Sequence, residues 1–67
     1  MNIKTEFTRL ECERFRRDCN FTPEELAVFD LAVQNKFNIQ IGLDLGMGQA
    51  TVSRKIESIK RKIIRVI

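Results

Sequence analysis

Apolar residues recur at helical spacing along most of the chain, and this pattern predicts an all-α protein. The clearest stretch is the last third, where apolar positions follow one another at intervals of four, three, four and three residues. No glycine or proline follows Gly48, so one long helix is expected to begin near Gln49 and to run toward the C-terminus. Its predicted inner face consists of Val52, Ile56, Ile59, Ile63 and Val66.

Three glycines mark the region just before this helix. Residues 39–45 keep a helical pattern, with Asn38 as the expected N-cap, and Gly46 and Gly48 bracket the break between the two helices. Gly42 lies inside the shorter helix, where glycine costs about 1 kcal/mol relative to alanine, so we expect it to permit close approach of the following helix. The spacing predicts a helix–turn–helix.

The preceding segment carries strong signals for the start of a helix. Thr22 is the expected N-cap, Pro23 takes the first helical position, and Glu25 completes a capping box. This helix is expected to end near Val33 or Gln34, with Val28 and Leu31 not assigned to either side. The residues predicted to face inward are Leu26, Phe29, Ala32 and Val33, followed by a loop over 34–37 with Phe37 in the core.

The N-terminal part predicts a further amphipathic helix over residues 2–18. Its expected inner side is formed by Ile3, Phe7, Leu10 and Phe15. The charged residues between them are expected to form a solvated face, in which Glu13 pairs with Arg16 or Arg17.

A chain of 67 residues makes one domain, here an all-α bundle of about four helices with an N-terminal helix in 1–19 and a helix–turn–helix core in 21–67. No apolar run approaches the roughly 20 residues of a membrane span, and the charged N-terminus lacks the apolar region of a secretory signal. We therefore expect a cytoplasmic protein without a membrane partner.

The residues that support catalysis and metal binding are scarce. The chain has no histidine, and Cys12 and Cys19 would lie about 10.5 Å apart on one helix, too far for a disulfide, so both are expected to be reduced thiols. Glu24 and Glu25 have no nucleophile or histidine beside them and sit where a helix dipole favours negative charge. We expect no enzymatic activity, no metal and no cofactor.

The net charge of +3 is distributed unevenly. Residues 1–20 carry five basic and four acidic groups, residues 21–48 carry one and four, and residues 49–67 carry six and one, which gives +1, −3 and +5. The positive charge is therefore concentrated on the long C-terminal helix. This distribution favours a polyanionic partner such as DNA over an evenly solvated surface.

Residues 21–63 resemble the helix–turn–helix shared by LuxR/GerE-type regulators and region 4 of bacterial sigma factors. The matching pieces are FTPEE at the start of a first helix, IGLDLGM across the turn, and TV followed by isoleucines at helical spacing and KI. The resemblance implies a regulator that binds double-stranded DNA. In that arrangement the helix from Gln49 enters the major groove, and the helix before it crosses the DNA backbone.

The outer face of the long helix supplies the candidate contacts with base edges. Arg54 is the first choice for reading guanine, Gln49 for adenine and Ala50 for a thymine methyl group. Glu57 either accepts a hydrogen bond from a cytosine amine or pairs with Arg54 or Arg61. The base-reading candidates are Gln49, Ala50, Ser53, Arg54 and Glu57, and the phosphate-binding candidates are Lys36, Asn38, Gln40, Thr51, Lys55, Lys60 and Arg61.

The end of the long helix is more apolar than a three-helix core requires. Its apolar cluster consists of Ile59, Ile63, Ile64, Val66 and Ile67. Two arrangements would cover this cluster: a homodimer with the C-terminal ends near the two-fold axis, which we favour, or a monomer in which the N-terminal helix covers the same residues.

The function that these patterns favour is transcriptional regulation by sequence-specific DNA binding, in a small protein of phage, mobile-element or accessory type. The alternative is an adaptor similar to sigma region 4 that binds RNA polymerase or another regulatory protein. A helix lying on a membrane surface would explain the lysines and isoleucines of 49–67 but not the glycines of the turn.

Overall fold

The computed structural model describes residues 7–67, which form four α-helices and no β-strand. These are α1 (Arg9–Asp18), α2 (Pro23–Val33), α3 (Asn38–Leu45) and α4 (Gln49–Val66). The all-α prediction is confirmed, as is one long helix beginning at Gln49. Among these residues, no helix combines the length and the apolar character needed to cross a membrane.

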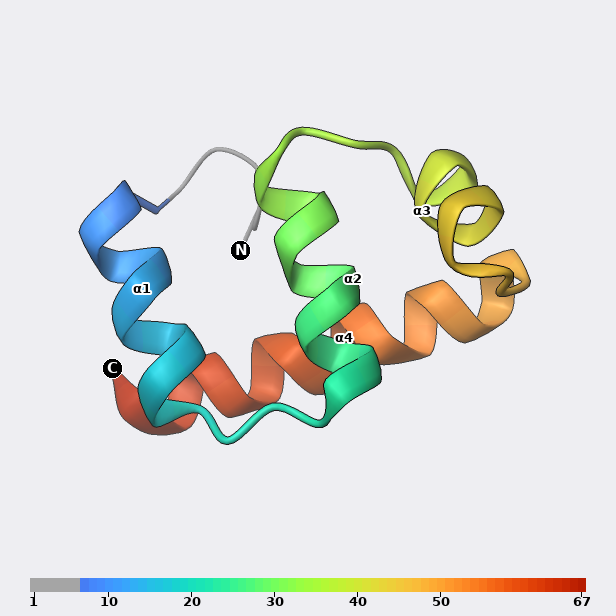
Figure 1. The fold of residues 1–67 in the computed structure, drawn as a ribbon. Helices are drawn as coiled ribbons and strands as arrows, with labels where there is room; N and C mark the ends of the chain where they lie inside the picture. The colour runs from blue at the N-terminus through green and yellow to red at the C-terminus, as the bar shows by residue number, and fades with distance from the viewer. Residues whose placement is uncertain (1–6) are drawn as a thin grey trace.

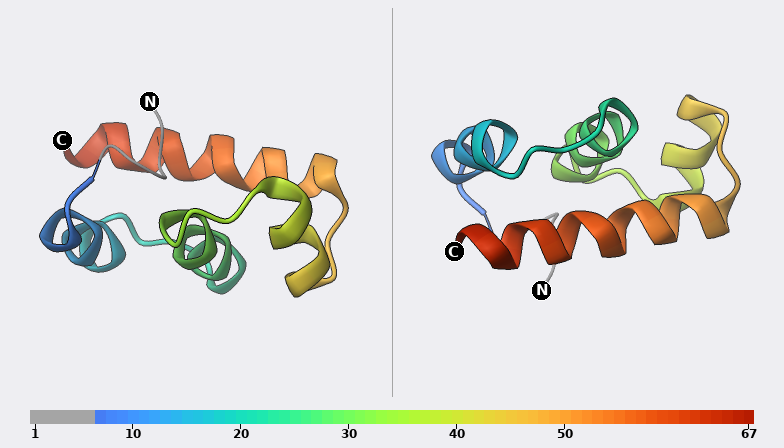
Figure 2. Two further views of the ribbon diagram at one scale, coloured as in Figure 1. Left: turned by 90° about the horizontal axis from the view of Figure 1, so that it is seen from above. Right: turned by 90° about the horizontal axis from the view of Figure 1, so that it is seen from below.

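The helices form two layers (Figures 1 and 2). The long α4 makes one layer, and α1, α2 and α3 lie side by side along it in the other. α1 packs near the C-terminal end of α4, α2 along its middle and α3 near its N-terminal end. The longest dimension of the molecule is 29 Å, close to the roughly 27 Å expected of an 18-residue helix, so α4 sets the length of the fold.

The core lies between these two layers. The inner face of α4 is the predicted one, with Val52, Ile59 and Ile63 fully buried and Ile56 and Val66 partly buried. The opposite layer contributes Cys12, Phe15, Cys19, Val28, Phe29, Ala32 and Ile41. Because α4 contributes to the whole length of this core, its other face is left to solvent.

The prediction for the N-terminal helix was wrong in its start and at Leu10, but Phe15 is buried as predicted and Phe7 packs against the core. α1 begins at Arg9 because Thr8 and Glu11 form a capping box there, and Phe7 lies before the helix. Leu10 is 77% exposed, and the inward positions are Cys12, Phe15 and Cys19. Ile3 and the predicted helical residues 2–6 lie outside the described part of the chain.

The start of α2 is as predicted. Thr22 and Glu25 form the capping box, and Pro23 is the first residue of the helix. Val28 is fully buried and Leu26 only partly. The loop after α2 also lies where it was predicted, but Phe37 is 69% exposed because it is the N-cap of α3, where extended backbone turns its side chain outward. Asn38, the predicted N-cap, is instead the first residue of α3.

The turn between α3 and α4 explains two of the glycines. Gly46 has a φ of +68°, a conformation that glycine adopts without strain, and the Met47 amide donates a hydrogen bond of 2.8 Å to the Gly42 carbonyl. A Cβ atom at Gly42 would lie 2.6 Å from the Met47 carbonyl oxygen. The close approach predicted at Gly42 is confirmed, with the turn backbone as its nearest neighbour and Val52 of α4 next.

Both cysteines are buried and neither forms a disulfide. Burial raises the pKa of the Cys12 and Cys19 thiols, more than the nearby Arg16 and Lys62 charges lower it. The thiols are therefore protonated at neutral pH and act as apolar core residues, as the prediction of reduced cysteines requires.

Candidate nucleic-acid interface

The outward face of α4 lies opposite the buried stripe, so side chains three and four residues apart line up along it. It contains three of the five predicted base-reading residues, Ala50, Arg54 and Glu57. Ser53 lies on its flank, and Gln49 begins the helix in line with Ile56. All five predicted residues are exposed, and they occupy the N-terminal half of the helix: Gln49, Ala50, Ser53, Arg54 and Glu57.

The cations on this face differ in their pairing from the arginines of α1. Each arginine of α1 pairs with a carboxylate: Arg9 with Glu13 (3.9 Å), Arg14 and Arg17 with Asp18 (3.5 and 3.2 Å), and Arg16 with Asp30 of α2 (2.7 Å). The predicted pairs of Glu13 with Arg16 or Arg17 do not form, because these arginines reach other carboxylates. Within residues 7–67, no ion pair engages the remaining cations of α4, which are Arg54, Lys60, Arg61 and Arg65.

Glu57 lies in the middle of these cations. Arg54 and Arg61 are its neighbours three and four residues away along the helix, at the spacing where ion pairs usually form. In the described part of the chain neither pair is present, so the pairing that the sequence suggested is not observed. The carboxylate of Glu57 is exposed and keeps its capacity to accept hydrogen bonds.

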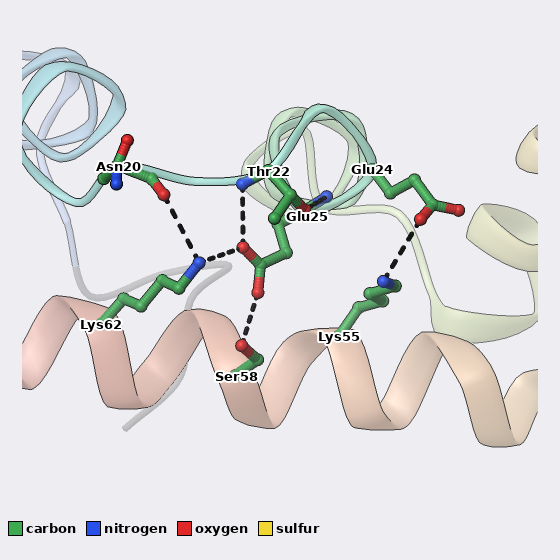
Figure 3. A network of polar contacts seen from close by, with 7 residues as sticks. All are labelled: Asn20, Thr22, Glu24, Glu25, Lys55, Ser58 and Lys62. Carbon is green, nitrogen blue, oxygen red and sulfur yellow. Dashed lines mark hydrogen bonds and ion pairs between the residues drawn. The ribbon is translucent and has the colours of Figure 1, made fainter.

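One flank of α4 is held against the start of α2 by a polar network (Figure 3). Glu25, only 4% exposed, accepts hydrogen bonds from the Ser58 hydroxyl, the Lys62 ammonium and the Thr22 amide. Lys62 also donates to the Asn20 carbonyl at 3.4 Å. This network fixes the rotation of α4 about its own axis and thereby the direction in which its outward face points.

The network also sets the protonation of Glu25. Burial alone would raise the pKa of this carboxyl, but the hydrogen bonds from Lys62, Ser58 and Thr22 and the charge of Lys62 outweigh it and lower the pKa to about 2. Glu25 is therefore ionised over the physiological pH range. The sequence predicts the capping box at Glu25 but not this network, although Ser58 and Lys62 are four residues apart on one flank of α4.

The same flank holds two of the predicted phosphate-binding residues. Lys55 is only partly exposed and pairs with Glu24 of α2 at 3.4 Å, and Thr51 is partly buried. Lys55 would have to give up Glu24 to reach a phosphate, so we leave it out of the proposed interface. Arg61 is exposed on the outward side of the helix, whereas Lys60 is only partly exposed and lies on the flank opposite Lys55.

The remaining phosphate-binding candidates gather at the start of α3. Lys36 and Asn38 are partly exposed and Gln40 is exposed. Neither α3 nor α4 has a side-chain cap at its N-terminus, since Phe37 and Gly48 are the N-cap residues. Within residues 7–67, neither N-cap side chain engages the first-turn N–H groups, which are therefore candidates for contact with an external acceptor such as a phosphate oxygen.

The predicted C-terminal apolar cluster divides into two parts. Ile59 and Ile63 are fully buried within the single chain, where the layer formed by α1, α2 and α3 covers them. For these two residues the expected monomeric arrangement holds, and they are not available for a dimer contact. Val66 is partly buried, and its carbonyl accepts a 3.1 Å hydrogen bond from Arg14 of α1. Ile64 and Ile67 are 60% and 71% exposed.

Among residues 7–67, no cluster of three or more histidine, cysteine, aspartate or glutamate side chains could hold a metal ion. Comparisons with protein-family models, with curated proteins and with solved structures found no match to the chain.

Proposed function

We propose that this protein binds double-stranded DNA in a sequence-specific way and regulates transcription. The observation that carries the proposal is a set of cations on the outward face of α4 that form no ion pair within residues 7–67: Arg54, Arg61 and Arg65, with Lys60 on the flank of that face. A helix that only covered a core would gain from pairing its charges, as α1 does. A face with unpaired cations and no core contact suits a polyanion.

In the proposed complex the N-terminal half of α4 enters the major groove. Arg54 forms two hydrogen bonds with guanine, Gln49 reads adenine, and Ala50 contacts a thymine methyl group. Ser53 lies between Ala50 and Arg54 along the helix. Lys60 and Arg61, about two turns beyond Ser53 and Arg54, contact phosphates, and the start of α3 contacts the backbone through Lys36, Asn38 and Gln40.

Selection from a random pool of DNA duplexes tests this proposal. The purified protein is incubated with the pool at about 50 and 200 mM salt, and the bound duplexes are sequenced. We expect an enriched motif, with weaker binding at the higher salt because each phosphate contact releases counterions. Arg54→Ala should weaken binding and remove one preferred base, whereas Arg17→Ala on α1 should leave the motif unchanged. Absence of enrichment would contradict the proposal.

We also propose that the DNA-binding form is a homodimer. Ile64 and Ile67 are the exposed members of the C-terminal cluster and lie at the opposite end of α4 from the base-reading residues. A two-fold contact there would hold the two groove-reading ends apart, as two half-sites require.

A second candidate function is that of an adaptor that binds RNA polymerase or another regulatory protein. It is favoured by Ile39 and Leu43, which are exposed and lie one turn apart on α3. An adaptor of this kind would show no motif in the duplex selection. It would also lose its protein partner when Leu43 is changed to serine, while Arg54→Ala would have no effect.

A further inference from the structure

Glu57 is the one acidic residue of α4 and the least expected side chain on a face proposed to meet DNA. Every described acidic residue of α1 and α2 either pairs with a cation or caps a helix: Glu11, Glu13, Asp18, Glu24, Glu25 and Asp30. Glu57 does neither within residues 7–67, although two arginines lie within one helical turn of it. Its exposed carboxylate can therefore accept a hydrogen bond from an external donor. Asp44 of α3 also forms no ion pair within residues 7–67, but it does not lie on the outward face of α4.

We propose that Glu57 reads a cytosine next to a guanine read by Arg54, an inference that rests on the proposed DNA binding. A carboxylate is repelled by phosphates, which line the edges of the groove, so Glu57 is placed over the groove floor. Major-groove edges offer two amino donors, N4 of cytosine and N6 of adenine. Adenine also presents the N7 acceptor beside its amino group, which repels a carboxylate, whereas cytosine presents no acceptor there.

The helix geometry fixes how close the two bases lie. Arg54 and Glu57 are three residues apart, so their Cβ atoms are about 5–6 Å apart on the helix surface. Successive bases of one strand rise about 3.4 Å, so this separation corresponds to one or two base steps. The recognised site should therefore contain a guanine and a cytosine no more than two steps apart. Arg61, on the other side of Glu57, lies farther from the base-reading end and contacts a phosphate.

A comparison of enriched motifs tests this assignment. The random duplex pool is selected with the unchanged protein, with Glu57→Gln and with Glu13→Gln. Glu13→Gln is the control: it removes one negative charge, as Glu57→Gln does, but Glu13 is exposed on α1, outside the proposed interface. Both variants should keep the helical circular dichroism spectrum, because both side chains are exposed.

We expect the unchanged protein to enrich a guanine and a nearby cytosine. Glu57→Gln should keep the guanine and lose the cytosine or replace it by adenine, the base that glutamine pairs with best. Discrimination at that position should fall by about five- to a hundredfold, the range for one good side-chain–base contact. Glu13→Gln should give the original motif.

A motif that is identical for the unchanged protein and Glu57→Gln overturns this inference but leaves DNA binding intact. So does an enriched motif without a cytosine near the guanine. Failure of the unchanged protein to enrich any motif contradicts the proposed function itself.

Discussion

Gly42 shows how a single residue fixes the angle between α3 and α4. Its α-carbon faces the Met47 carbonyl, and a Cβ atom would come within 2.6 Å of that oxygen. The Gly42 carbonyl in turn accepts the hydrogen bond from the Met47 amide that closes the turn. The residue is therefore part of the contact that holds the N-terminal end of α4 in place.

Replacing Gly42 by alanine should destabilise the protein by about 1 to 3 kcal/mol, because the turn backbone must move to admit the methyl group. Alanine favours a helix more than glycine does, so without this contact the same change would stabilise the protein. Thermal and urea unfolding followed by circular dichroism measure the effect. Gly48→Ser is the matched control, since nothing lies within 4 Å of a Cβ there and serine can cap α4. Higher stability of Gly42→Ala would contradict the role given to this contact.

Glu25 makes stability dependent on pH. Its folded-state pKa of about 2 is below its usual value of 4.5, so its contribution is fully present above pH 4.5 and is lost as the pH falls toward 2. A difference of this size corresponds to about 3 kcal/mol. Urea unfolding of the protein and of Glu25→Gln, which keeps a capping side chain but no charge, measures the contribution. We expect the difference in unfolding free energy to shrink between pH 5 and 2. A constant difference would mean that the charge of Glu25 does not stabilise the fold.

At the scale of the helix, α4 was the element best predicted from sequence. Its inner face follows from the spacing of Val52, Ile59 and Ile63, and its exposed face is what that spacing leaves over. α1 was predicted poorly because the pattern through Leu10 and the capping signal at Thr8 disagree, and the cap decides where the helix begins. The bonds of Ser58 and Lys62 to Glu25 join residues more than 30 positions apart, so no local pattern reveals them.

The two sides of α4 near its C-terminus should respond differently to truncation. Ile63→Ala removes a fully buried side chain and should cost about 2 to 5 kcal/mol, whereas Ile64→Ala should change the stability of the single chain by less than about 0.5 kcal/mol. Urea unfolding at low protein concentration compares the two. Equal losses would mean that the rotation of α4 about its axis differs from the one described.

At the scale of the whole molecule, acidic residues and unpaired cations are divided unevenly between the two layers of helices. The layer of α1, α2 and α3 contains all but one of the described acidic residues, and α4 contains most of the unpaired cations. The all-α class and the face of α4 followed from sequence. How that face is oriented relative to α3 did not, because it depends on the Gly42 contact and the Glu25 network.

The proposed homodimer involves the whole molecule. We expect sedimentation velocity to show a dimer that forms as the protein concentration rises, because Ile64 and Ile67 are exposed at the end of α4. Ile64→Ser together with Ile67→Ser should keep the protein monomeric with little change in thermal stability. If the unchanged protein stays a monomer at every concentration, Ile64 and Ile67 do not form the proposed dimer contact in solution.

The most direct test of the proposed DNA-binding face is a nuclear magnetic resonance titration of the isotope-labelled protein with the duplex enriched by selection. We predict that the largest amide shifts occur in the N-terminal half of α4, at Gln49, Ser53, Arg54 and Glu57, and at the start of α3, while the amides of α1 change little. Shifts confined to α1, or no shifts at all, would contradict the assignment of the outward face of α4 to DNA.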